Sequence, residues 1–528
     1  MRYIVSALLV GALACAPLLA SRASDASLPA AADNESAGKA DAGAAKKSAS
    51  DDAAAPATET VVHTQHSVSI SGHAVHYTAT AGTLIIRDSQ QQPQASVFYV
   101  AYTVDGGKPG RRPVTFLYNG GPGSSSMWLH MGSFAPVRIA TASPEATAPP
   151  PYHLVPNSDS LLDKSDLVFI DAVGTGYSRP LGKATGKDFW GVDPDISSFA
   201  RAIERYVSIN RRWNSPKFLY GESYGTTRSA ALVDALQDKG MSFNGVILMS
   251  SILNYGIRLP GYDEQYIGYL PSFAAAAWYH DKIANRPADL KSYLDRVRAW
   301  ANGPYAAALA QGQNLSAADT DAIARQLAAY TGLSVAFVKE ANLRINLGRF
   351  RKELLRDQRL TLGRFDSRFT GIDANAAGES PDYDASDSGI SGAFVSAFHD
   401  YIDRELKYHS DLDYRPTFGD IYKNWDWKHK AADETSPLPL AYVAGDLAHA
   451  MRTNPALKVL SVNGYYDFAT PFSITEFDLA HMNLDPSLVG NLQFLYYPSG
   501  HMVYLNTDAL KQLKGDLAHF YDHAAPQR

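Results

Sequence analysis

The chain has 528 residues, of which 45% are hydrophobic, so it can bury a large core in one unusually big catalytic domain or in two domains. Its formal net charge is −6 at pH 7 and it has no block of Lys or Arg, which argues against nucleic acid as a partner. A single cysteine, Cys15, excludes an intrachain disulfide. The stability of the protein must therefore come from its core.

Residues 1–23 have the layout of a secretory signal peptide, with an early arginine, an apolar stretch, and small residues up to a plausible cleavage site after Ala23. A short membrane anchor is the alternative, but the apolar stretch is too short and is interrupted by Pro17. Cys15 would suggest a lipoprotein, but it lies very early and the residues before it form a poor acceptor sequence. We predict an exported protein, periplasmic or secreted after cleavage of the signal peptide.

Residues 24–60 are mainly Ala, Ser, Asp, Lys and Gly, with no aromatic residue. Such a segment cannot offset the entropy of ordering by burying apolar surface. We predict a disordered linker here, and ordered structure from about Val61.

An α/β sheet is predicted for the part of the chain that follows. Runs with β character come first, then strands alternate with helices. The expected strands lie at 67–72, 73–82, 83–88, 95–104, 113–121, 165–178, 217–222 and 244–251. The expected helices are 194–209 and the segment after Ser223. Helix 194–209 has one apolar face, made by Ile196, Phe199, Ala200, Ile203, Tyr206 and Val207.

The alternation stops between about residues 254 and 438, where the chain is rich in Tyr and helical in pattern, as in 316–332 and 335–358. We predict an inserted helical lid. Strand patterns return at 456–464 and 491–500, and a closing helix is expected over 509–523. The predicted division is signal peptide 1–23, linker 24–60, first part of the core 61–253, lid 254–438 and second part of the core 439–528.

The segment LYGESYGTTR, residues 219–228, combines an apolar strand, a sharp turn and the start of a helix, with Ser223 at the apex. The pattern Gly-x-Ser-x-Gly is typical of a nucleophile elbow. The pattern alone is weak, but the apolar residues before the turn and the small Gly225 after it favour an elbow over an ordinary turn. A carboxylate directly before the nucleophile, Glu222, is unexpected, because its charge would oppose the oxyanion formed in acyl transfer.

A serine nucleophile needs a base, and the base needs an orienting acid. In α/β-hydrolases these follow in the order Ser, Asp, His at the ends of later strands. Asp467 lies just past the run 456–464, and His501 lies just past the next run, 491–500, so both are predicted to complete a triad with Ser223. Rivals in the same region lie in helical or polar surroundings and are interpreted as solvated or structural: Asp446, Asp478, His449 and His481.

An oxyanion hole needs two backbone N–H donors, one from the residue after the nucleophile and one from a Gly-rich loop after an earlier strand. Tyr224 supplies the first, and Gly121 in the loop NGGPGSSS, residues 119–126, is predicted to supply the second. A plain turn is the alternative for this loop, but two glycines followed by Pro-Gly exceed what a turn needs.

Four segments, NGGPGSSS, GESYG, NGYYDFATP and SGHMV, resemble in order and spacing the signature segments of the serine carboxypeptidase family (peptidase family S10). The resemblance covers the chain from about residue 61 to the end. It implies an α/β-hydrolase fold with a mixed, mostly parallel central sheet and an inserted helical cap. It also implies removal of one amino acid at a time from peptide C-termini, without a metal.

The resemblance gives Glu222 a role, since in the family this Glu and the Asn that opens the Gly-rich loop, here Asn119, hydrogen-bond the free carboxylate of the substrate. Two carboxyl groups can share a short hydrogen bond in a desolvated site only if one of them is protonated. We therefore expect Glu222 to work as a neutral acid. Binding of peptides should weaken as the pH rises through its raised pKa, whereas esters and amides should lose less.

The sequence also departs from the family pattern. Ser124 stands where the family usually has a disulfide-bonded Cys. In place of a second Glu that supports the first, His130 is interpreted as a donor to Glu222 that lowers its pKa, the alternative being an ordinary core histidine. Tyr504 stands where a Pro often follows His-Met-Val.

Three residues are candidates for the substrate pocket: Gly120, His130 and Met502. Met502 is expected beside the departing residue, although Met is also an ordinary filler of gaps in a core.

We predict a serine-type carboxypeptidase that acts on peptides with a free C-terminus and is favoured at acidic pH. An esterase or acyltransferase on the same fold, or a non-catalytic peptide-binding protein of the envelope, are the alternatives. The sequence has no His-Glu-x-x-His zinc signature and no dinucleotide or phosphate loop, so neither a metal nor a cofactor is expected.

Overall fold

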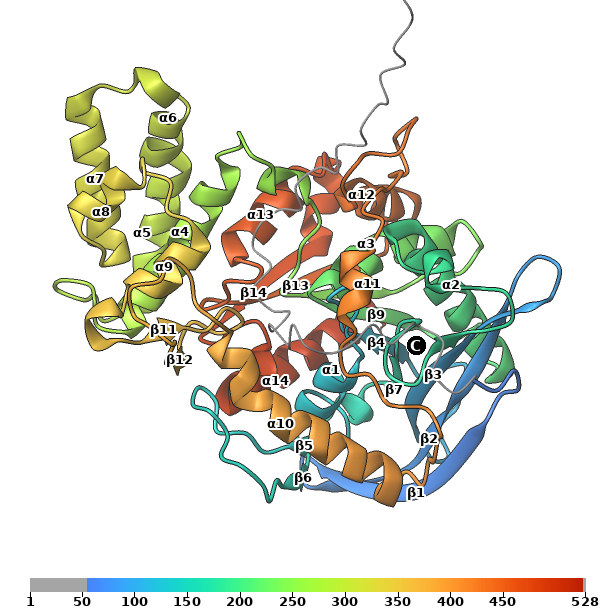
Figure 1. The fold of residues 1–528 in the computed structure, drawn as a ribbon. Coiled ribbons are helices and arrows are strands. Elements are labelled where there is room, and N and C mark those ends of the chain that lie inside the picture. The colour runs from blue at the N-terminus through green and yellow to red at the C-terminus, as the bar shows by residue number, and fades with distance from the viewer. Residues whose placement is uncertain (1–54, 526–528) are drawn as a thin grey trace, which may run out of the picture. The chain divides into compact units, whose positions relative to one another are not determined.

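The computed structural model describes residues 55–525 (Figure 1). The predicted signal peptide, Cys15 and most of the predicted linker lie outside the described residues and stay predictions. The last residues of the predicted linker are already fixed: Glu59 pairs with Arg205 at 2.8 Å and accepts a hydrogen bond from the N–H of Ile85 at 3.0 Å. The linker therefore ends before Glu59, just ahead of the first strand.

A ten-stranded sheet forms the centre, in the order β1-β2-β3-β7-β4-β9-β10-β13-β14, with β8 paired to β3. Its strands are β1 (Val61–Ile70), β2 (His73–Arg87), β3 (Pro93–Val104), β4 (Val114–Tyr118), β7 (Asp166–Ile170), β8 (Arg179–Pro180), β9 (Lys217–Glu222), β10 (Gly245–Met249), β13 (Lys458–Gly464) and β14 (Leu492–Tyr497). The pairs from β1 to β7 are antiparallel, and the pairs from β7 through β14 are parallel. The sheet is therefore mixed and mostly parallel, as predicted, although the runs 73–82 and 83–88 form one strand, β2, rather than two.

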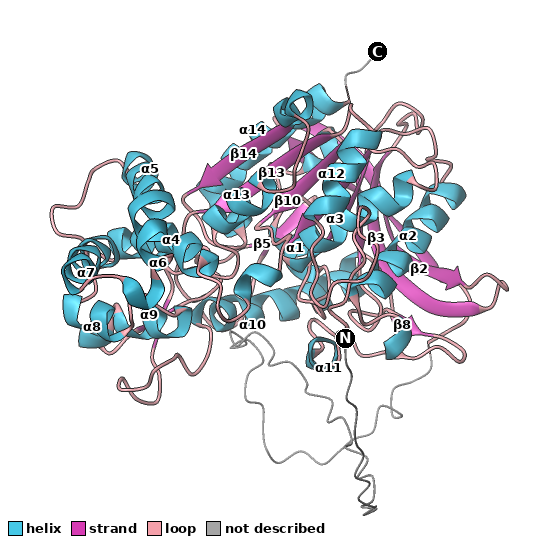
Figure 2. Ribbon diagram, turned by 90° about the horizontal axis from the view of Figure 1, so that it is seen from above, coloured by secondary structure: helices cyan, strands magenta, loops and turns pink. Residues whose placement is uncertain are grey.

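Helices cover both faces of the sheet (Figure 2). Side chains alternate along each strand, so that Phe218 and Tyr220 of β9 enter one core while Leu219 enters the other. The first core is closed by α1 (Met127–Gly132), α10 (Ala385–Asp400) and α14 (Thr507–Ala524), and the second by α2 (Val192–Ile209), α3 (Tyr224–Gln237) and α12 (Ala444–Thr453). All six apolar residues predicted for one face of α2 are buried in the second core.

The inserted helices, at the left of Figure 1, form a third core that also includes Tyr466, Phe468 and Phe472 from the later part of the chain. They are α4 (Glu264–Tyr279), α5 (Leu290–Trp300), α6 (Ala306–Leu309), α7 (Ala317–Thr331), α8 (Val335–Glu340) and α9 (Leu347–Glu353). The helical pattern over 335–358 forms two helices rather than one, because Asn342 and Leu343 have φ values of +51° and +63° and separate α8 from α9. Asn346 then caps α9 by accepting a hydrogen bond from the N–H of Gly348 at 2.8 Å.

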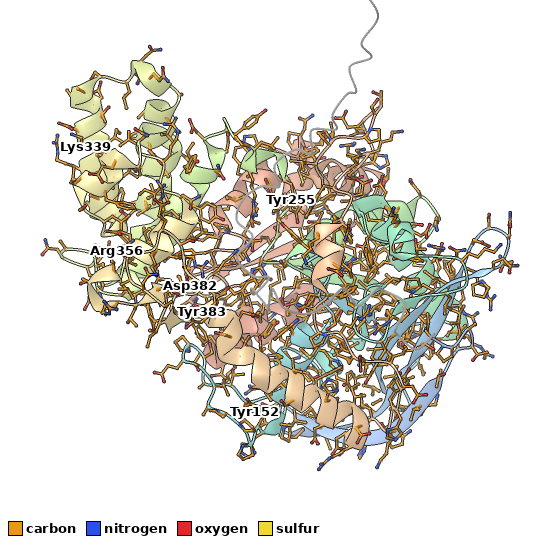
Figure 3. All side chains as sticks on the ribbon, viewed as in Figure 1. Tyr152, Tyr255, Lys339, Arg356, Asp382 and Tyr383 are labelled. Carbon is orange, nitrogen blue, oxygen red and sulfur yellow. The ribbon has the colours of Figure 1, made fainter. Side chains whose placement is uncertain are left out.

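The rest of the insertion returns to the sheet. Helix α10 packs in the first core, and Tyr152, labelled in Figure 3, lies against it, where a Cβ on Gly392 would meet the Tyr152 hydroxyl oxygen at 3.0 Å. The segment 414–429, which contains α11 (Gly419–Lys423), then runs beside the Gly-rich loop. The remaining strands are β5 (Val137–Ile139), β6 (Leu154–Pro156), β11 (Thr361–Leu362) and β12 (Thr370–Gly371), and the remaining α-helix is α13 (Phe472–Ala480).

Between residues 55 and 525, no helix has both the length and the apolar character needed to span a bilayer.

A buried ion pair ties α2 to α3 and to the start of the Gly-rich loop. The guanidinium of Arg228 donates to both carboxylate oxygens of Asp195, at 2.7 and 3.2 Å, and to the carbonyl oxygen of Asn119 at 2.8 Å. The side chains of Arg228 and Asp195 are only 1% and 3% exposed. Removing one partner would leave a buried charge without its counterion.

We expect Asp195→Ala to lower the free energy of unfolding by about 3–5 kcal/mol, as measured by urea denaturation, because Arg228 loses its counterion. The matched control is Glu204→Ala, which breaks an ion pair to Lys239 whose side chains are 28% and 45% exposed. That change should cost at most about 1 kcal/mol. Equal effects of the two substitutions would contradict a special contribution from the buried pair.

Candidate active site

Ser223 lies in a strained turn between β9 and α3, with φ +60° and ψ −131°. Two glycines make the turn possible: a Cβ on Gly221 would overlap the carbonyl of Gly225, and one on Gly225 would lie 2.7 Å from the carbonyl oxygen of Tyr118. The N–H of Ser223 donates to the carbonyl of Met249 on the neighbouring strand at 3.0 Å. The turn thus presents a half-buried serine at the carboxyl end of the parallel strands, as in a nucleophile elbow.

His501 and Asp467 lie together at the same edge of the sheet. Nδ1 of His501 is 2.8 Å from Oδ2 of Asp467, and both side chains are buried. The hydroxyl of Thr470 donates to Oδ2 of Asp467 at 2.7 Å, and Oδ1 accepts from the N–H groups of Ala469 and Thr470 at 2.7 and 3.0 Å. The carboxylate is therefore fixed in a position that leaves Nε2 as the free nitrogen of the imidazole.

The backbone around His501 is also held on both sides. Its N–H donates to the carbonyl of Phe365 at 2.6 Å, and its carbonyl accepts from the hydroxyl of Ser250 at 2.6 Å. The ring of Phe365 lies 5.1 Å from the imidazole at an angle of 31°. No hydrogen bond joins the described side chains of Ser223 and His501, a looseness that is common in substrate-free enzymes.

Glu222 is buried beside the nucleophile and is held by Asn119. The amide of Asn119 donates to Oε1 of Glu222 at 2.8 Å, while its oxygen accepts from the N–H of Leu129 at 2.8 Å. These two bonds fix the orientation of the Asn119 amide. The direction of its second N–H is therefore set before any ligand binds. The two residues predicted to bind a carboxylate are thus brought together.

Burial raises the pKa of Glu222 to about 7, although the nearby His501, Tyr504 and Asn119 work in the opposite direction. Burial opposes the charged form of His501, but the charge and hydrogen bond of Asp467, with a further contribution from Glu222, outweigh it and raise the pKa of His501. The two groups therefore compete for a proton near neutral pH.

The Gly-rich loop lies directly against the elbow. A Cβ on Gly120 would overlap the backbone nitrogen of Tyr224 and lie 2.6 Å from that of Gly225. Gly121 has a φ of +107°, and its N–H has no hydrogen-bond partner among the described residues. The N–H of Tyr224 is at the first position of α3, where the helix offers it no acceptor. The two predicted oxyanion donors are thus both unpaired and come from adjoining segments.

His130 does not contact Glu222. Its Nε2 lies 2.6 Å from the hydroxyl of Tyr102, and its ring stacks on Phe169 with centroids 4.4 Å apart. Burial lowers the pKa of His130 to about 3, so it is a neutral core histidine. The interpretation of His130 as a donor to Glu222 is wrong, because the helix α1 turns the imidazole toward β3 instead. Met502 is 7% exposed and packs in the first core beside the catalytic turn.

The rival acids and histidines have other partners. Asp446 pairs with His429 at 3.0 Å, and His449 pairs with Asp234 at 2.6 Å. Asp478 accepts from the N–H of Leu253 at 3.0 Å, and Nδ1 of His481 faces the carbonyl of Phe477 at 2.8 Å. Asp446 and Asp478 are buried rather than solvated. Their roles are structural.

One cluster in the described part of the chain has donors that could hold a metal ion: Asp234, Asp238 and His449, between α3 and α12. It is made by helices of the second core and includes none of the predicted catalytic residues. It therefore offers nothing to the chemistry at Ser223.

Two features of the site were missed in the sequence. The hydroxyl of Tyr504 faces Glu222 and Asn119, although the sequence only marked Tyr504 as an unusual residue. The segment 414–429 places Trp425 against Tyr224, with ring centroids 5.2 Å apart, and Trp427 against Tyr255, 4.6 Å apart. Tyr255 is labelled in Figure 3. The paired tryptophans in NWDW were the available signal of an aromatic surface beside the nucleophile.

Residues 72–301 match the family model described as serine carboxypeptidase. No curated protein matches the chain. The fold is similar to that of Kex1(delta)p, a prohormone-processing carboxypeptidase of Saccharomyces cerevisiae, with 16% identity over 84% of this chain and 91% of that chain and a TM-score of 0.50. A proline iminopeptidase of Mycobacterium smegmatis is 13% identical over 84% of this chain and 98% of that chain, with a TM-score of 0.36.

At such low identity the likeness to Kex1(delta)p concerns the fold alone, and with the sheet topology it confirms the predicted α/β-hydrolase fold. The matched segment contains the Gly-rich loop and the elbow, while Asp467 and His501 follow it in the chain. Residues 72–301, which include the Gly-rich loop and the elbow, are therefore similar to the serine carboxypeptidase family.

Proposed function

We propose that the protein releases C-terminal amino acids from peptides through an acyl-enzyme on Ser223, with His501 as base and Asp467 as the orienting acid. One observation carries the proposal: a buried carboxyl group, Glu222, is held by Asn119 next to the elbow. An esterase has no need of such a group, because its substrates have no free carboxylate at this position. A site for a C-terminal carboxylate does need one.

In the proposed reaction, Nε2 of His501 takes the hydroxyl proton of Ser223 as the oxygen attacks the last peptide carbonyl. The N–H groups of Gly121 and Tyr224 receive the oxyanion. The tetrahedral intermediate then collapses, and the amine leaves with the proton that His501 holds. Water then attacks the acyl-enzyme ester while His501 takes its proton, and His501 returns the proton to Ser223 as the acid is released. Asp467 stays ionised throughout and stabilises the imidazolium.

Glu222 binds the substrate carboxylate only while it holds a proton. The neutral acid can donate to that carboxylate, whereas the ionised form repels it. Since the pKa of Glu222 is raised to about 7, the donor is present below pH 7 and is lost above it. His501 must be neutral to act as base, and its raised pKa sets the acidic limit of the reaction.

The proposal includes export of the protein. It is supported by the sequence pattern of residues 1–23 alone. Peptides that reach the periplasm or the medium would then be the substrates.

For one peptide with a free C-terminus, kcat/KM should fall about tenfold per pH unit above pH 7, because Glu222 loses its proton. The amide and the methyl ester of the same sequence should show no such fall, since their binding does not need Glu222. Mass spectrometry from pH 4 to 9 measures the products. Glu222→Gln, which keeps a donor but cannot ionise, should abolish the alkaline fall for the free acid. Cleavage of the free acid and the amide with the same pH profile would leave an esterase or acyltransferase as the better conclusion.

Ser223→Ala should abolish turnover of both peptides and esters, because it removes the nucleophile, while Asp467→Asn should lower kcat by about 10⁴, because the imidazole is held in the wrong tautomer. Stopped-flow measurement with an ester should show an acyl-enzyme burst in the wild type alone. Residual wild-type binding of peptides without any turnover would instead support a peptide-binding protein.

Gly120→Ala should lower kcat by about 10²–10³ for every substrate, because the added Cβ overlaps the backbone at Tyr224 and displaces one oxyanion donor. Gly303→Ala is the matched control, since a Cβ there would meet nothing within 4 Å. The thermal unfolding midpoint of both variants separates loss of the oxyanion hole from loss of the fold. Unchanged kcat in folded Gly120→Ala would contradict the assignment of this loop.

A further inference from the structure

Two buried polar atoms meet in the carboxylate site without a partner. Neither Oε2 of Glu222 nor the hydroxyl of Tyr504 makes a hydrogen bond of standard geometry with another described residue. Both side chains are almost fully buried, at 2% and 1% exposure, and they lie close enough to perturb each other electrostatically. An unsatisfied buried donor beside an unsatisfied buried acceptor is costly unless the pair serves a purpose.

The fold positions Tyr504 at this point. It follows His501 in the short helical turn Val503–Leu505, which is fixed by a hydrogen bond from the Ser499 hydroxyl to the carbonyl of Val503 at 3.0 Å. Its ring packs on Gly132, where any Cβ would overlap the aromatic carbons. The glycine at the end of α1 thus makes room for the ring, while His130 of the same helix is turned away.

The charged and titratable groups around Glu222 are few. His501 and Asp467 face it from the catalytic turns, Tyr220 from its own strand, and Tyr504 from the turn after His501. Asn119 is neutral and occupies Oε1. Among the neutral side chains that act on Glu222, Tyr504 is thus the donor that remains for Oε2.

Resting on the proposed function, we infer that Tyr504 is a positioning residue for Glu222: its hydroxyl donates to Oε2 of the ionised carboxylate and so sets the pH above which substrates with a free carboxylate are no longer bound. A phenol stabilises the anion by donating to it, and burial together with the charge of Glu222 keeps its own proton in place by raising the pKa of Tyr504. A second carboxyl group at this position would act in the opposite sense, because two carboxyl groups share one proton. Tyr504 therefore lowers the upper pH limit for activity on substrates with a free carboxylate.

The test is Tyr504→Phe, with the free acid and the methyl ester of one N-acylated dipeptide as substrates. Removing the donor destabilises ionised Glu222, so the alkaline fall of kcat/KM for the free acid should move upward by about one pH unit. The ester profile should not move, because it does not depend on Glu222. Tyr497→Phe is the matched control: Tyr497 is also buried, but its hydroxyl donates to Asp516 at 2.6 Å.

If Tyr504→Phe lowers kcat/KM equally at every pH and leaves the midpoint of the alkaline fall unchanged, Tyr504 has only a packing role and the inference is overturned. A downward shift would also overturn it, since the hydroxyl would then stabilise the neutral acid. If the wild type turns over neither substrate, the proposed function fails, and infrared titration still decides the inference. The infrared band of Glu222 is identified as the carboxyl band that Glu222→Gln removes. This band should titrate at a higher pH in Tyr504→Phe than in wild type, and an unchanged titration midpoint would overturn the inference.

Discussion

Glu222 is a carboxyl group taken out of water at the end of a strand that is buried on both faces, and the arrangement of the site follows from the need to hold it there. Asn119 satisfies one of its oxygens and is itself a junction. Its side-chain oxygen accepts a hydrogen bond from the N–H of Leu129 in α1, and its carbonyl oxygen accepts one from Arg228 of α3. Arg228 in turn pairs with Asp195 of α2. Glu222 and Asn119 are thus held by the packing of three helices against the sheet.

Glu222 and His501 compete for one proton. The charge of Glu222 raises the pKa of His501, and the charge of His501 lowers the pKa of Glu222. The form with a proton on Glu222 and none on His501 has the same net charge as the form in which both are ionised. A substrate carboxylate selects the first form, since it needs a donor and repels an anion. An ester selects neither. In the proposed mechanism, recognition of the C-terminus is therefore coupled electrostatically to preparation of the base.

The sheet and the candidate site could be predicted from the sequence because parallel strands read as continuous apolar runs, and residues at their carboxyl ends meet at one edge. Ser223, Asp467 and His501 each follow such a run. The environment of His130 could not be predicted, because a short helix with buried residues on every side gives no periodicity to orient it. The break between α8 and α9 depends on Asn342 and Leu343, which have left-handed backbone conformations. No Gly or Pro at these positions indicates the break in the sequence. The sequence showed only that Tyr504 replaces a common Pro. Its position beside Glu222 could not be predicted, because the two residues are far apart in the chain.

The insertion makes backbone hydrogen bonds to the turns that carry Asp467 and His501. The N–H of His501 donates to Phe365, the N–H of Phe468 donates to Arg364 at 3.1 Å, and the carbonyl of Tyr466 accepts from Ser367 at 3.0 Å. These three bonds join residues 364–367 to both sides of Asp467 and to His501. Tyr466 and Phe468 are also members of the core that holds α4–α9 together. Removing residues 364–367 would leave buried backbone groups beside Asp467 and His501 without partners, so the turns that carry these two residues depend on the insertion for their structure.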